Sequence, residues 1–215
     1  FVLFNLEENG LIGSRQYVQT MRPKWREQGI KIVGMLSLEM LGYYDTKLGS
    51  QTNPFKGVPG LPQGELAGDF IALTTTASHA PFCTALAEAM TAAEPKVKIL
   101  KVDMFPIAPP DLLRSDHAPF MAAGVPAIMV TDTANFRNPN YHKPTDTLET
   151  LNPEYFTRTV RALAGAIDAL AGPMDKPAIE WKRQAHKPAD EPDPAKPKSA
   201  PDEQPKPPTE PAKPG

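Results

Sequence analysis

The chain has 215 residues and a formal net charge of −2, from 23 Lys and Arg against 25 Asp and Glu. A near-neutral chain with a pI of about 6.1 does not fit a nucleic-acid binder that works by neutralising phosphate. The sequence contains no run of about 18 apolar residues, so we expect no membrane span. Its one cysteine, Cys83, excludes an internal disulfide and a Cys-rich zinc ribbon.

The composition divides the chain into two parts. Nearly half of the 26 prolines lie in residues 173–215, interspersed with Lys, Asp and Glu. Such a segment cannot bury enough apolar surface to offset the entropy of ordering it, so we predict a disordered tail there. Residues 1–172 are long enough for a domain with its own hydrophobic core.

The first predicted elements are a strand, a helix and a second strand. Residues 1–6 are mostly apolar and predict a buried strand. Because chain termini are usually exposed, we interpret this opening as the C-terminal part of a longer protein. A helix is predicted over residues 14–28, with Ser14 as its N-cap and Gly29 ending it. The next strand is predicted over residues 30–38.

The rest of residues 1–172 predicts a loop followed by regular alternation. Residues 42–68 are rich in Gly, Pro, Asn and Thr and predict one long loop. Strands are predicted over 70–75, 97–102 and 126–130, and helices over 80–93, 117–124 and 153–171. This alternation predicts an α/β fold, a three-layer αβα sandwich around a mixed, largely parallel sheet.

Polar residues follow several of the apolar strands, where α/β folds place their sites. Glu7 and Glu8 follow the first strand, and Glu39 closes the second. One carboxylate of such a pair can bind a metal while the other takes a proton from water. The pair can equally be two surface acids at a turn.

Two later segments hold further candidates. Asp116 and His117 precede a short helix, where Asp116 can be a cap and His117 a packed residue. Tyr141, His142 and Asp146 lie in a polar segment, where His142 can bind a metal or be an exposed loop residue. No Gly-x-Ser-x-Gly elbow or glycine-rich phosphate loop is present in the sequence. Cys83 falls within a predicted helix and is expected to be a packing residue.

Together, four segments resemble, in order, the signatures of the co-catalytic two-zinc aminopeptidase family. That family also includes glutaminyl cyclases, glutamate carboxypeptidases and the non-catalytic transferrin-receptor ectodomain. The resemblance covers about residues 1–171. The four segments are Phe4–Tyr17, with its Glu-Glu pair, Leu38–Gly42, Ser115–Ala127, and Asp132–Thr147.

The resemblance implies a role for each candidate. Glu7 matches the general base that activates the nucleophilic water. Glu8 matches a ligand of one zinc, and Glu39, in place of the Asp of many relatives, matches a ligand of the other. His142 matches the final histidine ligand. The supporting or substrate-pocket residues implied are Asp116, His117, Tyr141 and Asp146.

The resemblance also implies that part of the site lies elsewhere. The family's His-x-Asp segment and the Asp that bridges its two zincs lie upstream in relatives and are absent from this sequence. We therefore expect a missing N-terminal part of the same chain to supply them. This chain alone is expected to hold an incomplete zinc shell and to be inactive. Relatives imply a periplasmic or secreted location.

The activity implied first is two-zinc hydrolysis at the N-terminus of peptide substrates. The alternatives are a glutaminyl-cyclase-like transferase with a single zinc, and a non-catalytic binding domain of the same fold. A carboxypeptidase of this family would need a cation for the substrate carboxylate, and Arg137 is the candidate near the site.

Overall fold

A computed structural model describes residues 1–172, so the tail predicted for residues 173–215 lies outside the described part. No helix within residues 1–172 is long and apolar enough to cross a membrane. The elements, in chain order, are α1 (Ile12–Glu27), β1 (Met35–Glu39), β2 (Asp45–Gln51), β3 (Leu66–Gly68), β4 (Phe70–Thr74), α2 (Ala80–Ala93), β5 (Lys98–Val102), α3 (His117–Ala122), β6 (Ala127–Thr131) and α4 (Pro153–Ala171).

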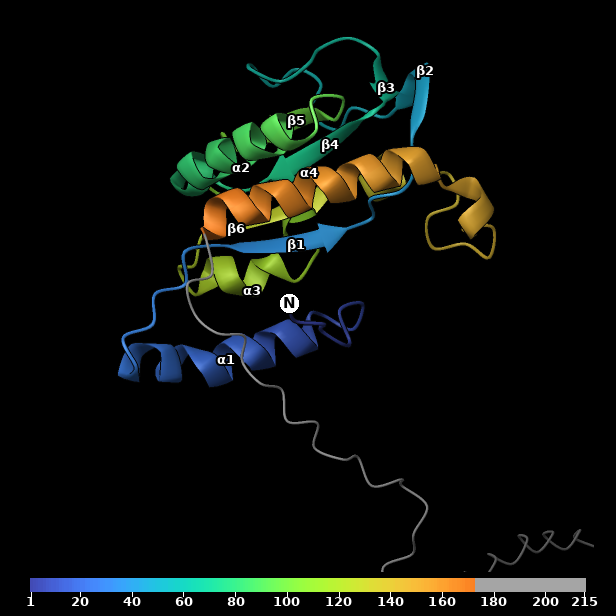
Figure 1. The fold of residues 1–215 in the computed structure, drawn as a ribbon. Helices are drawn as coiled ribbons and strands as arrows, with labels where there is room; N and C mark the ends of the chain where they lie inside the picture. The colour runs from blue at the N-terminus through green and yellow to red at the C-terminus, as the bar shows by residue number, and fades with distance from the viewer. Residues whose placement is uncertain (173–215) are drawn as a thin grey trace, which may run out of the picture. The chain divides into compact units, whose positions relative to one another are not determined.

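The main sheet has the strand order β1-β6-β4-β5. β1 pairs in parallel with β6, and β4 in parallel with β5, while β4 and β6 are antiparallel. Figure 1 shows α2 and α4 on one side of this sheet, with α3 and then α1 on the other. The α/β fold with a mixed, largely parallel sheet is therefore confirmed.

The main core lies between the sheet and the α2/α4 layer. Ile71 and Leu73 of β4 and Ile128 and Val130 of β6 are fully buried there, since alternate residues of a strand face one side. Leu86 of α2 packs into the same cluster. A second cluster joins α1 and α3 to the opposite face of the sheet, through Val18, Phe120, Val125 and Ala127.

Helices α2 and α4 follow their sequence signals closely. α2 and α4 have the predicted bounds. Pro153 occupies the first turn of α4, where its missing N–H costs nothing. Asn152 caps that turn, because its Oδ1 accepts a hydrogen bond from the Tyr155 N–H at 2.8 Å. Local sequence is enough to set where this helix begins.

The strand predicted over residues 1–6 is wrong. These residues form no strand, and Phe1 and Leu3 are fully exposed. A strand exists only where a neighbour completes its hydrogen bonds, and these residues pair with no strand within the described residues. Phe4 instead packs its ring on Tyr17 and Phe120, at centroid distances of 5.5 and 6.0 Å.

The start of α1 also differs from the prediction. The helix begins at Ile12, and Ser14 is a buried residue inside it rather than the N-cap. The Ser14 Oγ donates to the carbonyl of Leu11 at 3.2 Å, so the hydroxyl is used within the first turn. Gly29, at a φ of +64°, follows the end of the helix as predicted.

The strand predicted over residues 30–38 is shorter and later in the structure, at Met35–Glu39. Only these residues pair with β6, in register with Ala127–Thr131. Just before them the backbone of Gly34 lies against the Phe82 ring, where an added Cβ would stand 2.1 Å from a ring carbon. This close approach requires glycine and precedes the start of the strand.

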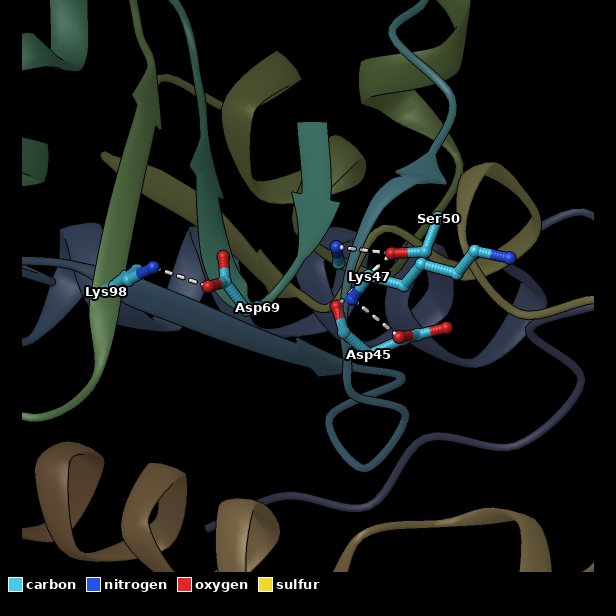
Figure 2. Close-up of polar contacts among 6 residues, drawn as sticks. Asp45, Lys47, Ser50, Asp69 and Lys98 are labelled. Atoms are coloured by element: carbon cyan, nitrogen blue, oxygen red, sulfur yellow. Dashed lines mark hydrogen bonds and ion pairs between the residues drawn. The ribbon is translucent and has the colours of Figure 1, made fainter. Parts of the chain in front are cut away.

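Residues 42–68 are not one long loop. They contain β2 and β3, which form a separate antiparallel two-stranded sheet with register shifts. Figure 2 shows Ser50 joining the two strands: its Oγ donates to the Asp45 carbonyl at 3.2 Å and accepts from the Gly68 N–H at 2.9 Å. An ion pair between Lys98 and Asp69, the single residue between β3 and β4, ties this link to β5. Because the register is irregular, these strands lack the clean alternation of apolar and polar residues that predicts a strand.

Candidate active site

Four of the predicted site residues come together at the carboxyl end of β1. Glu39 is the last residue of β1, and the segment after β6 leads to His142 at the same edge, because the two strands run in parallel. The turn before α1 brings Glu7 and Glu8 to the same place. All four side chains, with Tyr141, line one cavity of about 400 Å³.

The backbone at Glu7 is a tight turn. The Glu7 carbonyl accepts hydrogen bonds from the Gly10 and Leu11 N–H groups, at 3.1 and 2.8 Å. Leu6 and Leu11 on either side adopt left-handed conformations, with φ of 54° and 61°. Such strain in non-glycine residues is often found at functional sites.

Glu8 and His142 already contact each other. The His142 Nε2 lies 2.9 Å from the Glu8 Oε1, on a mostly exposed surface. The Tyr141 ring stacks on the His142 ring, with centroids 3.9 Å apart. The imidazole is therefore oriented from two sides.

The acids at this edge repel one another. Burial first, and then the charges of Glu39, Glu8 and Asp116, raise the pKa of Glu7 to about 7. Burial also raises the pKa of Glu39, while a hydrogen bond from Ser115 lowers it. The buried Oδ1 of Asp116 has no hydrogen-bond partner among residues 1–172. The crowded carboxylates of Glu7, Glu8 and Glu39 suit a cation.

The donor types fit zinc, which binds imidazole and carboxylate groups. The described residues nevertheless contain no group of three or more His, Cys, Asp or Glu side chains already placed around one point. Glu8 and His142 form one partial set of zinc ligands, and Glu39 is a further candidate ligand separate from that pair.

Three other predicted residues do not reach the cavity. His117 is fully buried, and its Nε2 lies 2.7 Å from the Leu112 carbonyl, which it can only contact as a donor. Burial lowers its pKa. Asp146 is exposed and accepts a hydrogen bond from the Asn138 side chain at 3.1 Å. Asp116 does not line the cavity, but its charge helps to raise the pKa of Glu7.

Arg114 is a cavity residue that the sequence did not single out. Its Nη1 donates to the Asn135 Oδ1 at 2.7 Å, and its Nη2 donates to the Tyr141 hydroxyl at 3.2 Å. The available signal was its position, directly before the Ser115-Asp116-His117 motif. Arg114 thereby braces the segment that carries His142.

Arg137 is a structural residue, which removes it as a candidate for a substrate carboxylate. It is 5% exposed and does not line the cavity. Its Nε donates to the Gln51 Oε1 at 2.8 Å, and its guanidinium lies 4.6 Å from the centroid of the Phe70 ring. It passes so close to Gly68 that an added Cβ would stand 2.8 Å from it. Arg137 therefore joins the two-stranded β2–β3 sheet to the main sheet.

The inner part of the cavity is mostly apolar. Its floor consists of strand residues on the face of the sheet away from α2 and α4, namely the apolar Phe70, Ala72, Leu100, Val102 and Met129 and the polar Thr74 and Thr131. Residues from the segments 42–68 and 135–141 line its sides. Cys83 faces the opposite core, where burial raises the pKa of its thiol to about 12, in agreement with a packing role.

Comparison with known proteins establishes the family. Residues 1–167 match peptidase family M28, so the chain belongs to that family. This confirms the zinc aminopeptidase family indicated by the four sequence segments.

The relatives are longer than this chain. Over 134 residues it is 33% identical to the uncharacterised protein YfbL of Escherichia coli (strain K12), covering 62% of this chain and 40% of YfbL. Its fold is similar to the LapA aminopeptidase of Legionella pneumophila, with a TM-score of 0.53, 22% identity, and coverage of 79% of this chain and 38% of LapA. It is also similar to BSAP, a zinc aminopeptidase from Bacillus subtilis, with a TM-score of 0.50, 20% identity and coverage of 78% and 34%. The chain thus spans between about a third and two fifths of the relatives it matches.

The two arginines should differ in their effect on stability. Arg137→Met keeps an apolar stem but removes the buried Nε donor to Gln51, and should lower the free energy of unfolding by about 2 kcal/mol. Arg114→Met, at a side chain that is 40% exposed, should cost less than about 1 kcal/mol. Urea unfolding followed by circular dichroism measures both. Equal losses would contradict a purely structural role for Arg137.

Proposed function

We propose that this protein is a zinc aminopeptidase that cleaves the first residue from peptides, using two zinc ions and Glu7 as general base. The observation that carries the proposal is the meeting of Glu7, Glu8, Glu39 and His142 on one cavity, in a chain of peptidase family M28. LapA and BSAP, which share the fold, are both described as aminopeptidases.

We further propose that the chain is the C-terminal part of a longer, exported parent protein. Residues 1–172 would be part of its catalytic domain, and residues 173–215 a tail. The relatives' greater length supports this. The upstream part would supply the His-x-Asp segment and the bridging Asp. Without them, the described residues hold a partial ligand set, so the chain alone should be inactive.

In the proposed mechanism Glu8 would hold one zinc and Glu39 the other, with His142 as the histidine ligand. Zinc, when bound, supplies a Lewis acid that polarises the peptide carbonyl and acidifies water. Glu7 takes a proton from the attacking water onto its carboxylate and then delivers it to the leaving amine. Burial, the largest cause of the raised pKa of Glu7, favours both transfers, because it moves the carboxyl group toward neutral pH.

The cavity also suggests the class of first residue. Its charged lining residues are the site acids and His142, together with Arg15, Asp111 and Arg114, whereas its floor is made mostly of apolar side chains from β4, β5 and β6. A long apolar side chain at the N-terminus of the substrate could displace water from this floor, which favours binding.

Glu7→Gln in the parent protein should leave zinc content unchanged and lower kcat by about 10²–10⁴, because the amide cannot accept the proton. Steady-state hydrolysis of aminoacyl-anilides and metal analysis measure the two quantities. The matched control is Glu88→Gln, at an exposed position of α2 away from the cavity, which should behave as wild type. Full activity in Glu7→Gln would remove Glu7 from the mechanism.

His142→Ala should weaken zinc binding by more than the roughly 10–100-fold typical of residues that merely support a ligand. Competition with a chelator measures the affinity. His79→Ala is the control, because His79 does not line the cavity. Equal zinc affinity in both variants would show that His142 is not a ligand.

Ala72→Phe should fill the cavity floor. We expect kcat/KM for leucine and phenylalanine anilides to fall about tenfold or more, while alanine anilide changes little. Leu100→Phe, from the neighbouring strand, should act in the same direction. Thermal unfolding of both variants checks that they are folded. A uniform loss for all substrates would argue against this cavity as the side-chain pocket.

Cyclisation of N-terminal glutamine by the wild type, without peptide hydrolysis, would favour the transferase alternative.

A further inference from the structure

The connection between β2 and β3 has no role in the proposed mechanism, yet it borders the cavity. It runs over residues 52–65, between Gln51 at the end of β2 and Leu66 at the start of β3, and is here called the β2–β3 loop. The lining residues from this loop are Thr52, Asn53, Pro54 and Phe55. Phe55 is the one aromatic residue among the four, so the loop presents a single aromatic ring to the cavity.

The first residues of the β2–β3 loop are fixed to the segment that follows β6. Gln51 is 5% exposed, and its Oε1 accepts a hydrogen bond from the Thr133 hydroxyl at 2.9 Å. The Thr52 N–H donates to the Phe136 carbonyl at 2.8 Å. Because this segment leads on to His142, the loop begins at a fixed place relative to the site.

Two amide side chains close the β2–β3 loop on itself. The Asn53 Oδ1 accepts from the Phe55 N–H at 3.0 Å, and its Nδ2 donates to the Pro62 carbonyl at 2.7 Å. The Gln63 Oε1 accepts from the Gly57 N–H at 2.7 Å, while its Nε2 donates to two carbonyls of the same loop at 2.8 and 2.6 Å. Side-chain amides of this kind take the place of backbone partners in turns, so the backbone at Phe55 is held in one conformation.

The Phe55 ring is packed as well. Its centroid lies 5.5 Å from that of Phe105, and aromatic rings at this separation attract one another. Phe55 also packs against the hydrophobic cluster of the buried Val102 and Leu112, both of which line the cavity. Because Val102 belongs to the cavity floor, the ring adjoins the β5 side of that floor. Phe55 is half-buried, so part of the ring borders the cavity while the cluster holds the rest.

A rigid wall of this kind discriminates between substrates by size. Close-packed side chains do not yield without cost, so a pocket bounded by them rejects a group that is too large. In a hydrophobic pocket one methylene changes kcat/KM by roughly 10–200-fold. The floor residues belong to strands of the main sheet, whereas Phe55 lies on a loop outside it. The size of the pocket can therefore be changed at Phe55 without disturbing the sheet.

We propose that Phe55 is a specificity-determining residue that limits the size of the first side chain of the substrate, and that Asn53 and Gln63 are positioning residues that hold it in place. The inference rests on the proposed function, because it takes the cavity as the pocket for the first residue. It predicts that the choice among substrates depends on the β2–β3 loop, while metal binding does not.

Two substitutions of Phe55 with opposite effects test the proposal, through kcat/KM of the parent protein for alanine, leucine and tryptophan anilides. Phe55→Ala enlarges the pocket and should raise the tryptophan-to-leucine ratio about tenfold or more. Phe55→Trp reduces the pocket and should lower the leucine-to-alanine ratio by a similar factor. General damage to the fold would lower kcat/KM for all three substrates alike. Unchanged ratios in both variants would overturn the proposal.

Two further variants act as controls for folding. Phe55→Leu keeps an apolar side chain in the cluster and should shift the tryptophan-to-leucine ratio in the same direction as Phe55→Ala, by a smaller factor. Phe156→Ala removes a phenylalanine that is 45% exposed on α4 and does not line the cavity, so its ratios should equal those of the wild type. Thermal unfolding checks that each variant is folded. A shift in Phe156→Ala as large as that in Phe55→Ala would overturn the proposal.

The positioning role of the amides is tested at Asn53. Asn53→Ala removes both hydrogen bonds and should raise the tryptophan-to-leucine ratio, because Phe55 is then free to move, while zinc affinity stays unchanged. Asn53→Asp keeps the acceptor for the Phe55 N–H and should restore most of the wild-type ratio. A purely structural role would lower thermal stability without changing the ratio. A wild-type ratio in Asn53→Ala would overturn the positioning role.

Calorimetric binding of free leucine and free tryptophan distinguishes a failure of this inference from a failure of the proposed function. Release of N-terminal residues by the wild type, with unchanged ratios in the Phe55 variants, would reject only the inference. No release by the wild type, with the relative affinity for the two amino acids still shifted by Phe55→Ala, would reject the aminopeptidase and keep Phe55 as the size limit of the cavity. Neither release nor a shift in binding would reject both.

Discussion

The parallel pairing of β1 with β6 is the constraint on which the site depends. Two parallel strands end at the same edge, so whatever follows each of them emerges side by side. Two bonds hold the emerging segments together: the Asp132 N–H donates to the Met40 carbonyl at 2.6 Å, and the Tyr43 N–H donates to the Asp132 carboxylate at 2.9 Å. Glu39 and His142, far apart in sequence, consequently share one cavity.

Strained backbone is concentrated at this same edge. Positive φ is found at Met40, directly after Glu39, at Thr133 and Ala134, after β6, and at His142. Each such non-glycine residue costs of order 1 kcal/mol or more. Asp132 offsets part of this cost after β6, because its Oδ1 accepts from the Ala134 N–H at 3.0 Å while Oδ2 accepts from Tyr43. Burial is the largest cause of the raised pKa of both Glu7 and Glu39, so the fold that brings the acids to one cavity also sets their proton affinity.

The elements that the sequence predicted well are those with local signals. α2 and α4 carry a 3.6-residue apolar period and a defined start, and β4 and β6 are short apolar runs, so their existence needs no knowledge of distant residues. Residues 1–6 are equally apolar but form no strand, because strand formation also requires a partner. The β2–β3 hairpin was missed for the opposite reason, since its bulged pairing hides the alternation that marks a strand.

The sequence by itself determined the α/β class, the family and the set of acids and histidine from which a site could be drawn, because residue types and their order are local information. Only the tertiary structure decided which of these residues meet. It placed His117 in the core and Asp146 on the surface, replaced Arg137 by Arg114 at the cavity, and packed Phe55 on Phe105 beside the cavity. Such contacts join residues on different elements. They depend on strand register and on the way the helices pack, and no pattern along the chain encodes them.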